Sequence, residues 1–279
     1  MQSAASVRTP VSQHMPSIED NKKYWTEYDW HQGGEEWSAA FGSTATQWFG
    51  ALLPRIHRFL PANTILEIAP GFGRWTQFLA GHCNRLIGID LCENCVLACK
   101  QRFAHDSRLS FHQNDGKSLA GIPSRSVDFV FCFDSLVNAN AEIVQAYTQE
   151  ISAKLTDHGV AFIHHSNVRA HAHYFQWLHR IPRGRGWLHR HGLIDLIDFW
   201  EDATMSAESM RRIACDAGLA CVSQELIPST VHKTRRTVSC ISVLTRPLSR
   251  WDKPLSVYDN VKYLAHAAHL KKLGQCYGQ

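Results

Sequence analysis

The sequence has no long apolar run and relatively little charge. None of its apolar segments approaches the roughly 18 residues that a membrane-crossing helix needs. Charged residues make up 19% of the 279 residues and the net charge is +4, against roughly 25% charged residues in ordinary soluble proteins. This composition excludes an integral membrane protein, a disordered chain, a collagen and a coiled coil. It predicts one globular domain, and so mild a charge does not call for nucleic acid as a partner.

The chain has nine cysteines, an odd number, and its first residues lack the apolar core of a secretory signal. We therefore expect free thiols in a reducing cytoplasm. Cys92, Cys95 and Cys99 have the spacing i, i+3, i+7, which places them on one face of a helix. No pair of histidines lies near them to complete a tetrahedral metal site. We interpret these three cysteines as packing residues of the core.

The pattern of the sequence divides the chain into four parts. Residues 1–20 are polar and irregular, which predicts a flexible tail. Residues 21–60 are helical in pattern and rich in aromatics, which predicts a cap, and residues 247–279 form a C-terminal extension. The core spans residues 61–246, and residues 170–203 interrupt it with histidines, tryptophans and a basic loop. We expect this insertion to be a lid above the site, because loops after strands carry specificity.

Short apolar segments alternate with helical patterns throughout the core. The strands are predicted at 64–69, 85–91, 109–113, 127–133, 159–165, 219–226 and 238–245, and the helices at 74–82, 93–103, 141–155 and 206–217. This alternation is typical of parallel strands connected by helices, whereas the last two strands have no helix between them and should pair antiparallel. The fold class predicted is α/β: a Rossmann-like, doubly wound sheet of seven strands, mostly parallel with an antiparallel last strand, and helices on both faces.

The most informative segment is 66–74 (LEIAPGFGR), in which a strand runs into a Gly-x-Gly turn and then a helix. Glycine allows a tight turn and a close approach of a ligand, and such ligands lie outside the carboxyl ends of the strands. A dinucleotide motif would have a third glycine where this chain has Thr76. Instead, the acids Glu67, Asp90 and Asp115 lie in or after the first three strands. They suit an adenosyl ligand with a positive charge and an amino-acid tail better than a pyrophosphate.

These residues resemble the class I S-adenosylmethionine (SAM)-dependent methyltransferases over about residues 60–168. The glycine motif of that family maps onto residues 67–73, with Pro70 where many members have glycine. The resemblance implies that SAM is the cofactor and that residues 28–37 are either a lid over it or a helical hairpin that caps the sheet. It also implies a set of binding residues: Glu67, Ala69, Pro70, Gly71 and Gly73 for the methionine moiety, Asp90 for the ribose, Leu91 beside the adenine, and Asp115 with Gly116 at the adenine edge.

Two further strand ends supply polar side chains beside the expected methyl group, and we predict Asp134, His164 and His165 as catalytic residues. Because successive residues of a strand point to opposite faces, only one of the two histidines should face the cleft. A histidine is suited to accept the proton of a hydroxyl acceptor. Alternatively, Asp134 with His164 or His165 could hold a divalent metal such as magnesium, which would acidify that hydroxyl.

The activity we expect is methyl transfer from SAM to a hydroxyl of a small molecule, with a sugar or related natural product as the favoured acceptor. The histidines and arginines of residues 170–203 predict a polar or anionic acceptor, and a homo-oligomer is compatible with the sequence. Residues 134–137 (DSLV) depart from the Asn/Asp-Pro-Pro-aromatic motif of the methylases that act on bases of nucleic acids, so neither nucleic acid nor a membrane is expected. Two alternatives stay open: an N-methyltransferase of a small amine or amino sugar, and a SAM-binding scaffold without catalysis.

Overall fold

The structure is a computed structural model that describes residues 17–180, 185–191, 194–195, 202–230 and 234–277. Residues 1–16 of the predicted tail lie outside the described residues, as do residues 181–184, 192–193 and 196–201 of the predicted lid. None of the helices in the described ranges is both long enough and apolar enough to cross a membrane.

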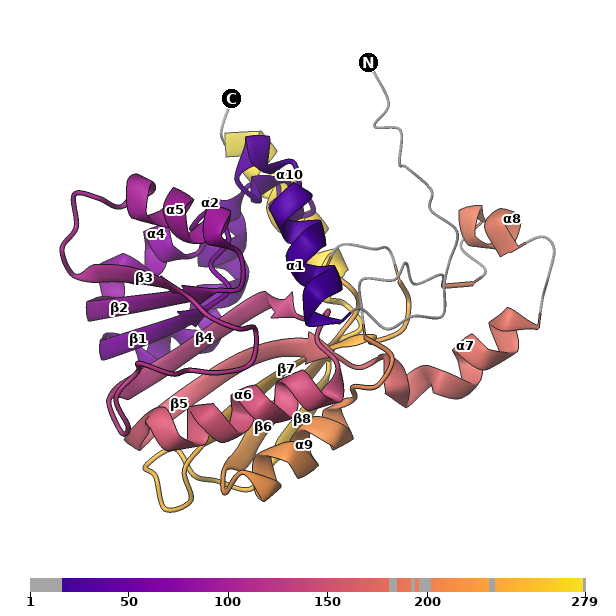
Figure 1. Cartoon of the computed structure of the whole chain (residues 1–279). Helices are drawn as coiled ribbons and strands as arrows, with labels where there is room; N and C mark the ends of the chain where they lie inside the picture. Colours follow the sequence, from indigo (N-terminus) through magenta and orange to yellow (C-terminus); the bar gives the residue numbers. More distant parts are fainter. Residues whose placement is uncertain (1–16, 181–184, 192–193, 196–201, 231–233, 278–279) are drawn as a thin grey trace.

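An eight-stranded sheet forms the centre of the molecule, in the order β3-β2-β1-β4-β5-β7-β6-β8 (Figure 1). The strands are β1 (Ala62–Ile68), β2 (Cys83–Asp90), β3 (Leu109–Gln113), β4 (Val127–Leu136), β5 (Leu155–Ser166), β6 (Ala220–Ile227), β7 (Ser239–Thr245) and β8 (Ser256–Asp259). Neighbours from β3 to β5 are parallel, and β7 lies antiparallel between β5 and β6. The predicted Rossmann-like, mostly parallel sheet is confirmed, but the predicted number of seven strands is wrong.

The additional strand, β8, pairs in parallel with β6 at the edge of the sheet. All four of its residues are exposed, so it lacks the alternation of apolar and polar residues by which a half-buried strand is recognised in a sequence. Only its backbone pairing with residues 223–226 makes it a strand. Sequence periodicity could not reveal it.

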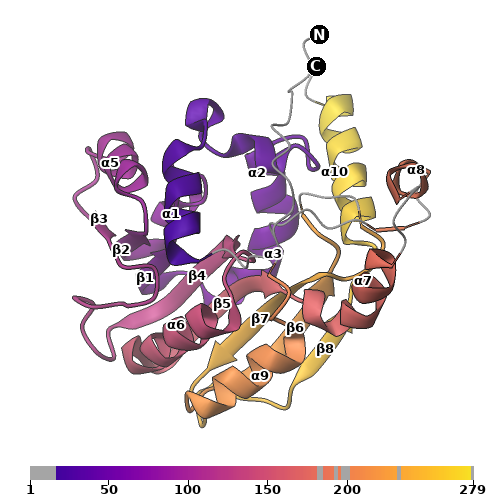
Figure 2. The same cartoon turned by 45° about the vertical axis from the view of Figure 1, so that its right-hand side comes forward.

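Helices cover both faces of the sheet (Figures 1 and 2). On one face lie α6 (Ala141–Lys154) and α9 (Ala207–Asp216), and on the other α2 (Thr44–Gln47), α3 (Leu53–Ile56), α4 (Thr76–Leu79), α5 (Glu93–Arg102) and α10 (Tyr263–Tyr277). Short helical turns complete the second layer: η3 (Trp48–Leu52), η4 (His57–Phe59) and η5 (Ala80–His82). The predicted helices on both faces are confirmed.

The continuous apolar run of β4 is explained by the two cores. Phe129, Phe131 and Phe133 pack in the core beneath α2–α5 and α10, whereas Val130 and Cys132 pack in the core beneath α6 and α9. Because alternate side chains of a strand point to opposite faces, a strand buried on both sides has no polar positions in its middle. This places the end of β4 deep in the molecule, next to the ends of β1 and β5.

The aromatic cap consists of α1 (Ile18–Glu27), η1 (Trp30–Gln32) and η2 (Glu35–Ser38). Helix α1 begins inside the stretch predicted as a tail, because Ser17 and Asp20 form a capping box: the Asp20 N–H donates to Ser17 Oγ (3.1 Å) and the Ser17 N–H to Asp20 Oδ2 (2.9 Å). The rings of Trp25, Trp30 and Trp37 pack together with centroids 5.5–6.1 Å apart. This cluster fixes η1 and η2 against α1.

The interruption at residues 170–203 carries η6 (Val168–His171), α7 (Ala172–His179) and α8 (Arg185–Arg190). In both views α7 and α8 stand apart from α1, on the side of the sheet where β6 and β8 lie (Figures 1 and 2). The described helices of the predicted lid insertion therefore lie apart from α1.

The stacked phenylalanines of β4 and β5 should carry much of the stability. Phe131 is fully buried and its ring stacks on Phe162 with centroids 5.7 Å apart. We expect Phe131→Ala to lower the free energy of unfolding by about 3–5 kcal/mol, as measured by urea unfolding. The matched control is Leu97→Ala on α5, where the leucine is 56% exposed and the change should stay within about 0.5 kcal/mol. Equal losses from both substitutions would contradict this arrangement of the core.

Candidate functional site

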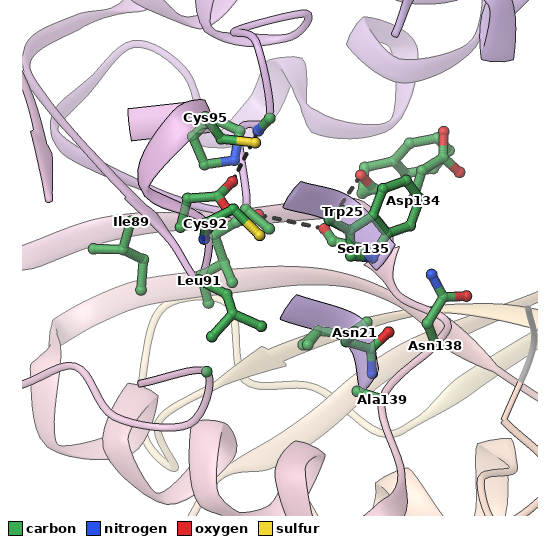
Figure 3. Close-up of a pocket in the computed structure, with 18 of the residues that line it drawn as sticks. Asn21, Trp25, Ile89, Leu91, Cys92, Cys95, Asp134, Ser135, Asn138 and Ala139 are labelled. Atoms are coloured by element: carbon green, nitrogen blue, oxygen red, sulfur yellow. Dashed lines mark hydrogen bonds between the residues drawn. The ribbon is translucent and has the colours of Figure 1, made fainter. Parts of the chain in front are cut away.

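A cavity of about 970 Å³, its open mouth included, lies at the carboxyl ends of β1, β2 and β4 (Figure 3). Its size is in the range of small-molecule sites, roughly 300–1,000 Å³. The sheet contributes residues 68–71, 89–92 and 133–136, and the aromatic cap contributes Ile18, Asn21, Trp25, Trp30, Gly33 and Trp37. No described residue of 170–203 lines it. The cover of this cavity is thus the cap that precedes the sheet in the sequence.

The glycine turn between β1 and α4 forms one wall of the cavity. Its backbone takes left-handed conformations at Ala69, Gly71 and Gly73, with φ values of 54°, 57° and 82°. A Cβ on Gly71 would lie 3.0 Å from the ring of Trp30, and one on Gly73 would lie 2.5 Å from the ring of Phe103. The first glycine therefore permits close approach from the cavity side, and the second permits the turn to pack on α5.

Asp90, the last residue of β2, lines the cavity and fixes the glycine turn. Its Oδ2 accepts a hydrogen bond from the backbone N–H of Gly71 (3.0 Å), and its Oδ1 accepts one from the N–H of Cys92 (2.9 Å). Burial raises the pKa of Asp90 to about 6, although these N–H donors oppose the shift. Each carboxylate oxygen retains acceptor capacity, so the side chain can receive two more hydrogen bonds from adjacent hydroxyls of a ligand.

Glu67 lies behind the glycine turn and is not part of the cavity lining. Its Oε2 accepts a hydrogen bond from Thr76 Oγ1 (2.6 Å), while Oε1 is buried without a partner among the described residues. Burial raises the pKa of Glu67 to about 7. Glu67, the acid predicted to bind the methionine moiety, is therefore a buried residue that holds the start of α4 through Oε2. Its Oε1 remains able to accept a hydrogen bond.

Only two of the three residues predicted to contact the adenine lie in the cavity lining. Leu91 and Gly116 line the cavity, but Asp115 does not. The Asp115 carboxylate accepts hydrogen bonds from the N–H groups of Lys117 (3.0 Å) and Ser118 (2.7 Å), and these outweigh its slight burial and lower its pKa. Its observed contacts are those of a turn-forming residue.

Asp134 lines the cavity near the end of β4, with a left-handed backbone (φ 63°). Its Oδ2 lies 2.7 Å from Arg74 Nη2, its Oδ1 lies 3.1 Å from His164 Nδ1, and Thr230 Oγ1 donates to Oδ1 (3.0 Å). Burial would raise the pKa of Asp134, but the hydrogen bond from His164 and the charge of Arg74 outweigh it and lower the pKa to about 2. This carboxylate is therefore ionised at any physiological pH.

The two histidines of β5 point to opposite faces of the sheet. His164 lies directly behind the cavity wall: it pairs with Asp134, its ring stacks on Phe133 with centroids 4.6 Å apart, and its Nε2 is buried without a partner among the described residues. His165 lies on the other face, where its Nδ1 is 2.8 Å from the Ser166 carbonyl and its Nε2 is 2.8 Å from Ser242 Oγ. Burial lowers the pKa of His165 to about 4. Neither histidine lines the cavity, but the His164 side chain contacts two residues that do, Asp134 and Phe133.

The predicted metal site is not assembled by the described residues. Asp134 and His164 are in contact, but His165 lies on the opposite face of the sheet, and Arg74 is the ionic partner of Asp134. Among the residues with described placement, no group of three His, Cys, Asp or Glu side chains converges as metal ligands would. Of the predicted magnesium ligands, the structure brings Asp134 and His164 together but directs His165 to the opposite face of the sheet.

Several residues of the cavity were not found by sequence reasoning. Arg74 follows the glycine turn directly and stacks against Trp37 and Trp75, with its guanidinium carbon 5.2 and 4.2 Å from the ring centroids. Asn138 lies after β4 and has an Oδ1 without a partner among the described residues. The sequence contains no periodicity that singles out such positions, because chain segments far apart in sequence bring them together.

Part of the chain matches a known family of domains. Residues 65–159 match a family model described as a methyltransferase domain, which covers β1 to β4 and the start of β5. No protein of curated function matches the chain.

Solved structures of methyltransferases share the fold. Magnesium protoporphyrin IX methyltransferase (ChlM) from Synechocystis PCC 6803, with bound S-adenosylhomocysteine (SAH), is 16% identical with a TM-score of 0.54, over 82% of this chain and 99% of that chain. A SAM-dependent methyltransferase from Clostridium acetobutylicum is 12% identical (TM-score 0.51; 79% and 93% covered). Another, from Methanosarcina mazei, is 15% identical (TM-score 0.51; 70% and 98% covered).

The raised pKa of Glu67 predicts a pH-dependent stability. The folded chain keeps the Glu67 proton up to a pH of about 7, whereas the unfolded chain loses it near the ordinary value of 4.5, so this residue destabilises the fold increasingly as the pH rises between these values. We expect Glu67→Gln to gain on the order of 2 kcal/mol relative to wild type between pH 5 and pH 8, measured by urea unfolding. The exposed Glu142→Gln is the control. If the free energies of unfolding of wild type and Glu67→Gln change with pH in parallel, the prediction is contradicted.

Proposed function

We propose that this chain, which carries a class I SAM-dependent methyltransferase domain, methylates a hydroxyl of a small molecule, with sugars and related natural products as the favoured class. The observation that carries the proposal is the ionised Asp134 carboxylate, which lines the cavity and is paired with His164 behind it. A hydroxyl acceptor needs a group that receives its proton as the new bond forms. Asp134 and His164 together supply such a group next to the cavity.

The residues of the cavity fit the SAM that the domain implies. The two oxygens of Asp90 suit a pair of ribose hydroxyls, and Leu91 and Gly116 offer an apolar surface for a flat adenine. The close approach allowed at Gly71 suits the methionine end, beneath which Glu67 has a buried acceptor atom without a partner among the described residues. Tryptophan rings on the cap side suit a positively charged sulfonium.

SAM supplies an activated methyl group, and the chain would position the acceptor for in-line attack and exclude water. Asp134 would accept a hydrogen bond from the acceptor hydroxyl and so point an oxygen lone pair at the methyl. As the new carbon–oxygen bond forms, the hydroxyl proton would pass to the Asp134–His164 pair, whose side chains are in contact. Arg74 would keep Asp134 ionised until then, and the aromatic cap would close the cavity. His165 has no part in this mechanism, because its ring lies on the other face of the sheet.

N-methylation of a small amine or amino sugar is the second candidate. The observation in its favour is the negative charge of the Asp134 carboxylate, whose pKa is lowered to about 2. This charge would attract a cationic acceptor and stabilise a cationic product. The tryptophans near it add favourable cation–π contacts. A polar or anionic acceptor, a homo-oligomeric state and a cytoplasmic location stay predictions from the sequence.

Asp90 should control the affinity for the cofactor. We expect Asp90→Asn to weaken the binding of SAH by about tenfold, or 1.4 kcal/mol, because an NH2 group, which cannot accept a hydrogen bond, replaces one of the two acceptor oxygens. Since burial raises the pKa of Asp90 to about 6, wild-type affinity should rise as the pH increases through 6, and the variant should lose this dependence. Calorimetric titration at pH 5, 6 and 7 measures both effects. Asp115→Asn is the control, and an equal weakening there would show that the adenine site includes Asp115 after all.

The two adjacent histidines offer a matched test of catalysis. In a screen of hydroxyl and amine acceptors with labelled SAM, we expect His164→Gln to lower kcat about 10²-fold or more for a hydroxyl acceptor and His165→Gln to leave it within a few-fold. SAH affinity, measured in parallel, reports whether each variant still folds. If only amines are methylated and His164→Gln retains full kcat, N-methylation replaces the favoured proposal. If no acceptor is methylated although SAH binds, the result favours the alternative of a SAM-binding scaffold without catalysis.

A further inference from the structure

Two of the nine cysteines, Cys92 and Cys95, line the cavity, and the mechanism above uses neither of them. Cys92 is the N-cap residue of α5 and directly follows Leu91, and Cys95 lies in the first turn of the helix. Figure 3 labels Cys92 next to Leu91 and Cys95 above both of them. All nine cysteines are free thiols, and these two are buried against the cavity. A Cys-x-x-Cys pair at a helix N-terminus is the arrangement found in thiol–disulfide centres.

Cys92 and Cys95 are three residues apart at the start of α5, and both line the cavity. The interaction between the two side chains lowers the pKa of Cys92 and raises the pKa of Cys95. The Cys92 sulfur also accepts from Thr26 Oγ1 (3.8 Å), and its thiol donates to the Lys22 carbonyl (3.7 Å). Cys99 differs, because its thiol donates to the Gly71 carbonyl (3.1 Å) and it does not line the cavity. Cys92 occupies the N-cap of α5, where the end of the helix stabilises a thiolate, so it is assigned as the nucleophile and Cys95 as the resolving thiol.

We propose that Cys92 and Cys95 form a peroxide-sensitive dithiol at the edge of the cofactor cavity, and that its oxidation to a disulfide weakens cofactor binding. The Cys92 thiolate attacks one oxygen of hydrogen peroxide, breaks the oxygen–oxygen bond and releases hydroxide, which leaves a sulfenic acid on Cys92. The Cys95 sulfur then attacks the Cys92 sulfur, and water leaves as the sulfur–sulfur bond forms. In sum, two thiols and one peroxide give one disulfide and two waters.

The link from the disulfide to the cofactor site runs through the Cys92 backbone. Its N–H holds Oδ1 of Asp90 (2.9 Å), and a disulfide requires its sulfurs to approach to about 2.05 Å with a dihedral near 90°. Closing the bond therefore pulls on the N-cap of α5 and on the orientation of Asp90. It also withdraws the Cys92 sulfur from Thr26 and Lys22, which are contacts of α1 and hence of the cap. This consequence, unlike the oxidation itself, rests on the proposed function.

The experiment starts with the reduced full-length chain, which is treated with about one equivalent of hydrogen peroxide. We expect the loss of two thiols and a disulfide within the tryptic peptide of residues 86–100, which contains Cys92, Cys95 and Cys99. Differential alkylation should find Cys99 still free. SAH affinity measured by calorimetry should fall about tenfold on oxidation and return after treatment with dithiothreitol. Saturating SAH, added before the peroxide, should slow the loss of the two thiols.

Variants separate this pair from the other cysteines. Cys92→Ser and Cys95→Ala should each abolish the disulfide and make SAH affinity insensitive to peroxide, and two different positions guard against misfolding of one variant. The matched control replaces the exposed Cys215 and Cys276 by serine, which should leave both effects intact. A disulfide that involves Cys99, no disulfide at all, or unchanged SAH affinity in the oxidised wild type overturns the proposal. If the reduced chain binds no SAH, the proposed function fails, and thiol counting still reports whether the dithiol forms.

Discussion

The Asp90 carboxylate connects three parts of the chain that are separate in sequence. It ends β2, accepts a hydrogen bond from the glycine turn after β1, and accepts another from the first residue before α5. Because both donors are backbone N–H groups, the carboxylate determines how the two strand ends stand relative to each other. The cavity and the Cys92–Cys95 pair both lie at this junction. A loss of its geometry would therefore alter the cavity before it affected the rest of the sheet.

A second buried carboxylate, Asp134, has the opposite electrostatic state. Asp90 is surrounded by neutral donors and burial dominates, so its pKa is raised, whereas Asp134 contacts Arg74 and His164 and its pKa is lowered. The two acids are therefore suited to different tasks within one cavity: Asp90 to neutral hydroxyls and Asp134 to an acceptor with a proton to lose or a charge to stabilise. Their environments, rather than their residue type, make this difference.

Much of the architecture could be predicted because it follows from local patterns. The continuous apolar run of residues 127–133 indicated a strand covered on both faces, and the Gly-x-Gly turn after β1 indicated a ligand site at the strand ends. The alternation of His164 and His165 indicated that one of them would be separated from the site. Strand β8 could not be predicted, because a four-residue exposed edge strand is stabilised by its neighbour and not by a pattern of its own.

The sequence by itself determined seven of the eight strands, the glycine turn and the three acids in or after the first three strands, because strand periodicity, turn chemistry and residue order are local properties. The tertiary structure alone decided which of those acids reach the cavity, and it placed Glu67 and Asp115 outside its lining. It also decided that residues of the aromatic cap, and none of the described residues of 170–203, line the cavity, and that Arg74 pairs with Asp134. These are contacts between segments that are distant along the chain, and packing in three dimensions fixes them.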